Sequence, residues 1–143
     1  MFDFAVEAKS EKSLFESQKH FDFAVIGGGP AGMNAALYAI RKGLSVAVFS
    51  LEIGGQLHNT SEVDNYIGIE NTTGGKLSEA FHHHVLELGV PIKTGHLVTK
   101  LEKPDDFHIT LDNNEVYTAK TVLYATGGAP RKLGVPGEEE FAN

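Results

Sequence analysis

The chain has 143 residues, no cysteine and a formal net charge of −7. This length allows one domain with a substantial core, and the lack of cysteine excludes disulfides, thiolate metal sites and thiol redox chemistry within this sequence. The acidic balance argues against nucleic acid or an anionic membrane as a partner, and no apolar run is long enough to predict a membrane span. The N-terminus lacks a basic start followed by an apolar core, so we expect a cytoplasmic protein.

Residues 1–20 are expected to form an N-terminal extension without a site. The pentapeptide FDFAV occurs twice, at 2–6 and again at 21–25, and we assign this repeat no function. A short helix is expected over 10–19, with Leu14 and Phe15 as its apolar contacts.

The stretch 23–32 predicts a nucleotide-binding turn. Its four apolar residues indicate a strand buried on both faces, and they run directly into Gly27-x-Gly29-x-x-Gly32. In such a motif the first glycine permits the tight turn and the second lets the backbone approach a pyrophosphate. The third allows close packing of the following helix on the strand.

The residues after this turn complete a strand–helix–strand unit. Residues 33–42 are rich in good helix formers, Pro30 suits the first helical turn, and Gly43 is a natural stop. A second apolar strand is expected over 44–49. Free amides at the start of the helix, around Ala31, would attract an anion.

An acidic residue about 20 positions beyond the glycines normally binds the adenosine ribose of a dinucleotide. Glu52 is the carboxylate at that distance, and we place it slightly past the end of the second strand. Ser50 is the competing ligand, and a solvated surface charge is the alternative interpretation of Glu52.

Residues 53–74 are expected to form a long connection without regular structure, which is more often functional than not. Gly54 and Gly55 allow close backbone approach to a ligand, and Gln56 offers a donor and an acceptor. A polar surface loop is the alternative. A helix is expected over 75–88, and its consecutive histidines, residues 82–84, point in different directions and therefore predict no metal site.

The remaining segments predict short strands. After a strand at 91–94, three strands over 97–102, 107–111 and 116–118 should form an antiparallel meander with Asp/Asn turns, for which we expect no calcium. A separate buried strand is expected over 120–124. It ends in Ala125-Thr126-Gly127, small residues at the strand end where ligands bind.

Together these motifs resemble low-molecular-weight thioredoxin reductases. The resemblance covers about residues 21–143 and depends on the order and spacing of five segments: 27–32, 54–57, 63–66, 125–127 and 133–137. It implies an α/β fold, namely a Rossmann-like FAD-binding domain with a parallel sheet, helices on both faces and a small antiparallel β-meander crossover. Two departures are Ile67, where the family usually has proline, and a linker to Glu52 that is about one residue short.

The resemblance also implies which residues hold FAD. The pyrophosphate would lie at the first glycine loop, the ribose after the second strand, the flavin near the 55–65 segment and the adenine near the backbone of Val98. The residues implied are Gly27, Gly29, Pro30, Ala31, Gly32, Ser50, Glu52, Gly55, Gln56, Leu57, Asn65, Val98, Ala125, Thr126 and Gly127.

By the same resemblance, residues 21–143 are the first part of an FAD domain. The NADPH domain, its Cys-x-x-Cys and the remainder of the FAD domain lie outside this sequence, so no catalytic residue is expected here. The complete enzyme would pass electrons through FAD to a thioredoxin-like protein disulfide. Two alternatives stay open: a related ferredoxin or flavodoxin–NADP reductase without the cysteine pair, and a non-catalytic FAD- or nucleotide-binding module. A second chain or a homodimer could complete the domain.

Overall fold

The computed structural model describes residues 14–129 and 131–141. The first FDFAV copy and the start of the expected 10–19 helix lie outside these ranges, while residues 14–17 form a helical turn. None of the helices in the described ranges is long and apolar enough to cross a membrane.

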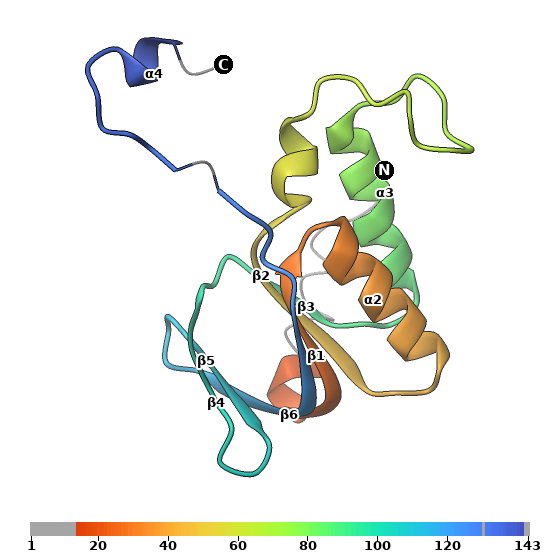
Figure 1. Ribbon diagram of the computed structural model, residues 1–143. Coiled ribbons are helices and arrows are strands. Elements are labelled where there is room, and N and C mark those ends of the chain that lie inside the picture. Colours follow the sequence, from red (N-terminus) through yellow and green to blue (C-terminus); the bar gives the residue numbers. More distant parts are fainter. Residues whose placement is uncertain (1–13, 130, 142–143) are drawn as a thin grey trace.

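One mixed sheet of six strands organises the chain, in the order β3-β2-β1-β6-β5-β4 (Figure 1). Strands β3, β2, β1 and β6 run parallel, whereas β6, β5 and β4 are antiparallel. The strands are β1 (His20–Gly28), β2 (Val46–Ile53), β3 (Ile92–Thr94), β4 (Val98–Glu102), β5 (Phe107–Leu111) and β6 (Val116–Tyr124).

Two helices cover one face of the parallel strands. Helix α2 (Pro30–Arg41) connects β1 to β2, and α3 (Gly74–Glu87) lies in the chain segment that connects β2 to β3 (Figure 1). The predicted stop at Gly43 is confirmed, because Lys42 is the C-cap and Gly43 has a φ of 80°. A 3₁₀ turn, η1 (Gly55–Asn59), precedes α3, and a short helix, α4 (Glu138–Phe141), ends the described chain.

Side chains that alternate along β1 and β2 divide the core in two. Val25 and Val48 pack with α2 and α3, whereas Ala24 and Phe49 face the meander. Phe15, from the helical turn at 14–17, is buried on this second face against Phe49, with ring centroids 5.8 Å apart. The residues just before β1 therefore contribute to the core.

The expected division of residues 116–124 into two strands is wrong. They form the single strand β6, whose residues 116–119 pair with β5 and whose residues 118–124 pair with β1. The expectation that 120–124 is buried is also wrong, since Lys120 and Thr121 are exposed and Tyr124 is 73% exposed. The physical reason is that β5 pairs only with residues 116–119, so the rest of β6 borders β1 alone within the described chain.

Strand β2 is longer than expected, and Glu52 lies within it rather than past its end. The connection that follows is also more ordered than expected, since it contains η1 and an isolated bridge between Val63 and Thr72. The sequence did not predict this order, because a short 3₁₀ turn and a single bridge produce no repeating pattern of apolar residues.

Candidate nucleotide-binding site

The turn from β1 into α2 is close-packed because two of its glycines lack a side chain. At Gly27, whose φ is 121°, a Cβ would clash with the carbonyl oxygen of Ala125; at Gly32 it would clash with the carbonyl oxygen of Gly27. These positions bring the ends of β1 and β6 and the start of α2 together, as expected for the first and third glycines of the motif.

Gly29 differs from both neighbouring motif positions. It is the N-cap of α2 with an ordinary φ of −80°, and a Cβ there would meet nothing within 4 Å. No side chain caps the helix, and Pro30 and Ala31 are exposed just beyond it. The space above the turn is therefore open, and backbone amides of the first helical turn are left for another acceptor.

Ser50 fastens the end of β2 to the end of β1. Its hydroxyl accepts a hydrogen bond from the Gly28 amide at 2.8 Å and donates to the backbone carbonyl of Glu52. The Ser50 side chain is buried and engaged within the protein. The carboxylate of Glu52 is exposed and makes no hydrogen bond or ion pair with the described residues. The structure thus leaves Glu52, more than Ser50, available to a ligand.

The start of the η1 segment lies beside the glycine turn. The Gly54 amide donates to the Gly28 carbonyl at 2.8 Å, and a Cβ on Gly55 would be 3.8 Å from the Gly29 Cα. The side-chain amide of Gln56 donates to the backbone carbonyl of Gly128. Segments that are far apart in sequence therefore meet at the carboxyl end of β1.

The end of β6 closes this group. The Ala125 amide donates to the Ile26 carbonyl at 2.8 Å, which continues the β1–β6 pairing past the strand end. Thr126 and Gly127 follow and are exposed. The structure thus brings together the 27–32 turn, the end of β2, residues 54–56 and residues 125–128.

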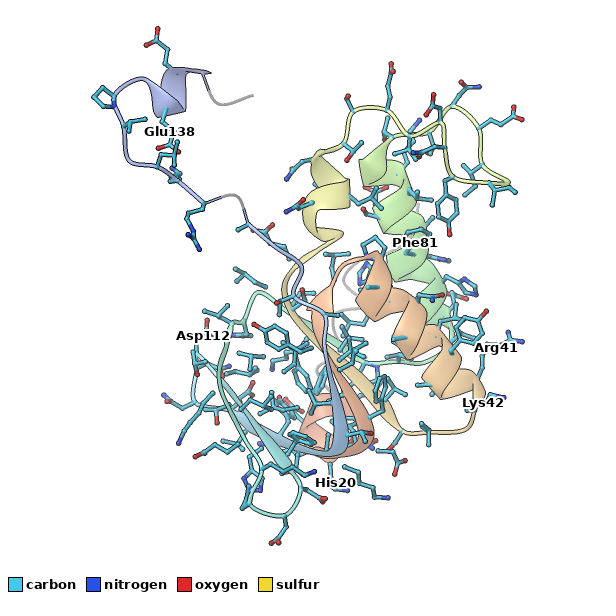
Figure 2. The ribbon with its side chains drawn as sticks, in the orientation of Figure 1. His20, Arg41, Lys42, Phe81, Asp112 and Glu138 are labelled. Atoms are coloured by element: carbon cyan, nitrogen blue, oxygen red, sulfur yellow. The ribbon has the colours of Figure 1, made fainter. Side chains whose placement is uncertain are left out.

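Three predicted residues lie apart from this group. Leu57 is half-buried, and its carbonyl accepts from the Thr60 amide within η1. Asn65 is exposed on a loop whose next residue, Tyr66, packs against Phe81 with ring centroids 5.8 Å apart. Phe81 itself lies on α3 (Figure 2). Val98 begins β4 and packs against the core cluster on the meander face.

Sequence reasoning missed the role of Gly28. A Cβ there would lie 2.7 Å from the Ser50 hydroxyl oxygen, so this position also requires glycine. The signal was available, because 27–29 is an uninterrupted glycine triplet although the motif demands only its first and third members.

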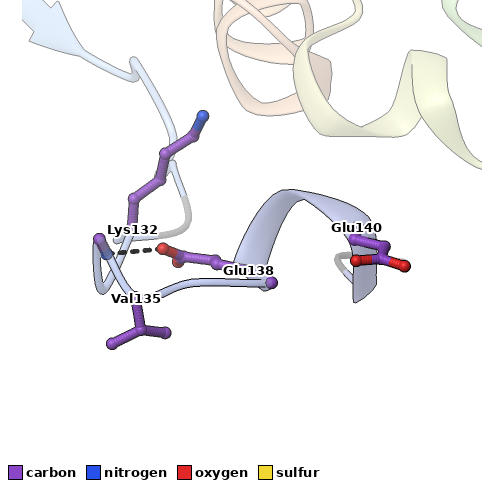
Figure 3. Close-up of a pocket in the computed structure, with 6 residues that line it drawn as sticks. Lys132, Val135, Glu138 and Glu140 are labelled. Atoms are coloured by element: carbon purple, nitrogen blue, oxygen red, sulfur yellow. Dashed lines mark hydrogen bonds between the residues drawn. The ribbon is translucent and has the colours of Figure 1, made fainter.

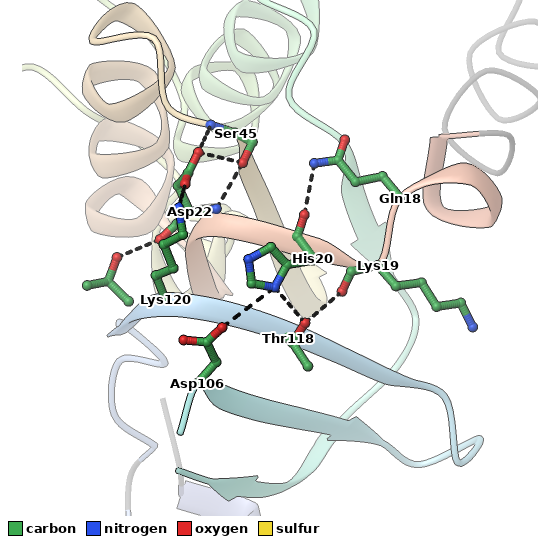
Figure 4. Close-up of polar contacts among 9 residues, drawn as sticks. Gln18, Lys19, His20, Asp22, Ser45, Asp106, Thr118 and Lys120 are labelled. Carbon is green, nitrogen blue, oxygen red and sulfur yellow. Dashed lines mark hydrogen bonds and ion pairs between the residues drawn. The ribbon is translucent and has the colours of Figure 1, made fainter. Parts of the chain in front are cut away.

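A second polar cluster lies at the opposite, amino-terminal ends of the parallel strands (Figure 4). Asp22 accepts hydrogen bonds from the Ser45 amide and hydroxyl, at 3.0 and 2.8 Å, and from the Lys120 ammonium at 2.7 Å. The Lys120 bond, followed by those from Ser45, holds the pKa of Asp22 well below its usual range. Both oxygens of this carboxylate already have a donor from the chain.

The C-terminal segment also forms a hollow, which is lined by residues between 132 and 140 (Figure 3). Glu138 accepts from the backbone amides of Leu133 and Gly134, at 2.6 Å each, and these bonds lower the pKa of its carboxyl. Residues of a single segment form all its walls, away from the glycine-lined strand ends (Figure 1). Within residues 14–129 and 131–141, no three His, Asp or Glu side chains are arranged to hold a metal ion.

Comparisons with known proteins agree with this geometry. Residues 21–143 match the family model of pyridine nucleotide-disulphide oxidoreductases. The chain is 38% identical over 135 residues to alkyl hydroperoxide reductase F of Staphylococcus aureus, and 39% identical over 134 residues to a Bacillus subtilis NADH dehydrogenase. Each alignment covers 94% of this chain but only 27% and 26% of those proteins.

The fold matches as well as the sequence. Thioredoxin reductase from Streptococcus pyogenes superposes with a TM-score of 0.77 at 40% identity, covering 85% of this chain and 40% of that one. The family match spans nearly all of the described residues, including every strand from β1 to β6 apart from His20. The chain therefore belongs to the pyridine nucleotide-disulphide oxidoreductase family, and its Rossmann-like fold matches part of the structure of thioredoxin reductases.

Proposed function

We propose that this chain is the FAD-binding portion of a thioredoxin-reductase-like flavoprotein, which passes electrons through FAD to a protein disulfide. The observation that carries the proposal is the open space above Gly29, bordered by the uncapped start of α2 and by three further backbone segments. A dinucleotide pyrophosphate needs such a close approach to backbone amides.

The residues present fit FAD. The 27–32 turn would receive the pyrophosphate, with Gly27 and Gly32 fixing its shape and Gly29 leaving room for the phosphate oxygens. Glu52 would accept hydrogen bonds from the adenosine ribose hydroxyls, and the Val98 backbone would contact the adenine. Gly55, Gln56, Leu57 and Asn65 would line the flavin side, and Ala125, Thr126 and Gly127 would close over the cofactor.

The division of labour follows from what this chain contains. When bound, the isoalloxazine ring of FAD supplies the redox chemistry, while the protein binds and orients it. The sequence has no cysteine, so the dithiol that receives the electrons, the NADPH site and the contact with a thioredoxin-like substrate would be supplied from outside it. The chain spans about a quarter of the length of its curated relatives, which is consistent with this division.

The free side of β6 supports a further part of the proposal. Beyond residue 119, β6 pairs with β1 on one side, and the described chain places no strand on the other. An unpaired strand edge favours the addition of another strand. We propose that a strand from elsewhere in the protein, from a second chain or from a homodimer partner completes the FAD domain here.

Titration of the purified chain with FAD tests the proposal. We expect binding by the unaltered chain and at least a ~100-fold weaker affinity for Gly29→Val, because the side chain would occupy the pyrophosphate position. Gly75→Val is the matched control, since a Cβ there has ordinary contacts at 3.9 and 4.0 Å. Equal FAD affinity for Gly29→Val and the unaltered chain would contradict the site assignment.

The intact mass and visible spectrum of the purified protein test the completed domain. A flavin spectrum with a heavier species or a second polypeptide supports completion by a partner. A 15.4 kDa monomer that keeps a flavin spectrum would show that no partner is needed.

A further inference from the structure

The connection between β3 and β4 borders the end of β2. Ser50 pairs with Thr94 in the parallel ladder, and the next residue, Gly95, donates its amide to the Leu51 carbonyl at 3.1 Å. Leu51 immediately precedes Glu52. Residues 95–97 therefore lie at the carboxyl ends of two parallel strands, where nucleotide ligands bind in such sheets.

Asp112, in the turn between β5 and β6, fastens this connection. Its Oδ1 lies 2.8 Å from Nδ1 of His96, and its Oδ2 accepts the Leu97 amide at 3.1 Å. Its own amide donates to the Leu97 carbonyl at 2.9 Å. Three hydrogen bonds thus join two segments about 15 residues apart, just beyond the last β4–β5 pair, Val98 with Leu111.

Burial of apolar side chains does not explain how residues 95–97 are held in their conformation. Leu97 is 52% exposed, Gly95 is exposed and His96 is partly exposed, and none of the three belongs to the buried core. A loop with few buried contacts is normally among the least stable parts of a fold. Here both oxygens of the Asp112 carboxylate bind this loop, one at His96 and the other at Leu97. These hydrogen bonds hold residues 96–97 in place, as buried apolar contacts do in other segments.

The groups around this contact keep Asp112 ionised. The hydrogen bond from His96, followed by that from the Leu97 amide, lowers the pKa of Asp112. The side chain of Asn113 lies 3.5 Å from the other ring nitrogen of His96 and donates to Glu115 at 3.0 Å. Glu115 in turn pairs with Lys93 of β3 at 2.7 Å. The turn is thus tied to β3 at a second point.

We propose that Asp112 is a positioning residue for the adenine nucleotide half of the cofactor, acting with His96 through the backbone of residues 96–98. This inference rests on the proposed function, because it assumes that adenosine binds beside Glu52. Asp112 itself would not touch the ligand: it lies on the meander, on the other side of the sheet from α2 and α3 (Figure 2). An ordinary surface ion pair would have little effect on ligand affinity.

Calorimetric titration with ADP, the adenosine half alone, tests the proposal. We expect Asp112→Ala to weaken ADP binding about tenfold, because two hydrogen bonds that fix the connection are lost. Asp112→Asn keeps one acceptor oxygen, so its ADP affinity should lie between that of the unaltered chain and that of Asp112→Ala. Asp105→Ala is the matched control, because it removes the same charge from an exposed turn of the same meander.

Amide hydrogen exchange gives a second readout that needs no ligand. The Leu97 amide should exchange faster in Asp112→Ala, while amides within β5 stay protected; circular dichroism verifies that the variant folds. If Asp112→Ala fails to fold, Asp112→Asn takes its place in both measurements.

The outcomes separate the two proposals. Unchanged ADP affinity in the Asp112 variants, with binding by the unaltered chain, overturns the positioning role and leaves the proposed function standing. If the unaltered chain binds neither ADP nor FAD, the proposed function fails, and the positioning role fails with it.

Discussion

The two ends of the parallel strands use polar groups in opposite ways. At the amino-terminal ends, Asp22, Ser45 and Lys120 satisfy one another, and Thr121 donates to the Asp22 carbonyl at 2.7 Å (Figure 4). At the carboxyl-terminal ends, glycines replace side chains, and the Glu52 carboxylate has no partner in the described chain.

The difference separates structural charge from functional charge. A carboxylate that already accepts three hydrogen bonds has little left to offer a ligand, and a strongly lowered pKa, as at Asp22, then reports a structural contact. At the other end, the Glu52 carboxylate has no partner among the described residues, no side chain caps the start of α2, and the space above Gly29 is open. The strongly lowered pKa of Asp22 thus lies at the end of the sheet opposite the proposed nucleotide site.

The largest expected effect is on stability, from a substitution that disrupts the glycine turn at the carboxyl-terminal end of β1. Gly32→Val places a side chain against the Gly27 carbonyl and within 3.0 Å of Val25, and we expect a loss of at least ~4 kcal/mol in unfolding free energy, enough to prevent folding. Circular dichroism with urea titration measures it. A cooperative transition at the unaltered midpoint would show that the turn can relax, contrary to the close packing described above.

Ser50→Ala should sharpen the view that Ser50 holds the two strand ends together. It removes the acceptor of the Gly28 amide and the donor to the Glu52 carbonyl, so we expect about 2–3 kcal/mol lower unfolding free energy. FAD affinity, measured where the variant is folded, should change less than it does for Glu52→Gln. If affinity falls while stability does not, Ser50 rather than Glu52 would be the ribose ligand.

Glu52→Gln should affect binding without affecting stability. Because the carboxylate is exposed and has no partner among the described residues, we expect unchanged urea unfolding and a loss of about 1–3 kcal/mol in binding of ADP, measured by calorimetry. Glu62→Gln, another exposed carboxylate on the following loop, is the control. Equal losses of ADP affinity in both variants would mean that only the net charge of the protein matters, and that Glu52 does not bind the ribose.

Asp22→Asn should lower stability slightly without affecting cofactor binding, and its effect should be the smallest of the four. The native pKa of Asp22 lies below its unfolded value, so its contribution is present above the unfolded pKa of about 3.9 and disappears as the pH falls through the native value. We expect a slightly lower unfolding midpoint at pH 7, a difference that shrinks below about pH 4, and unchanged FAD affinity. A variant with the same midpoint as the unaltered chain at pH 7 would mean that the exposed Lys120 pair contributes nothing.

Several features could be predicted from local sequence. The apolar run into 27–32, the helix stop at Gly43 and the helix near 75–88 all depend on neighbouring residues, and each is present within a few positions of the expected bounds. The need for glycine at 27 and 32 followed from the motif, because the spacing of three glycines encodes a fixed turn geometry.

Other features depend on residues distant in sequence. Whether 116–124 forms one strand or two depends on the partners of each half, β5 and β1, and its exposure depends on a neighbour that residues 120–124 lack within the described chain. The role of Ser50 became apparent only when the end of β1 was placed beside it. His96 and Asp112, 16 residues apart, gave no recognisable motif at all.

The sequence by itself determined the βαβ unit, its glycine turn and the family resemblance, because each is specified by local spacing and by residue types with restricted backbone freedom. Only the tertiary structure decided which polar groups find partners and which stay open to a ligand. Hydrogen-bond satisfaction is a property of groups brought together by the sheet, and no local pattern records it.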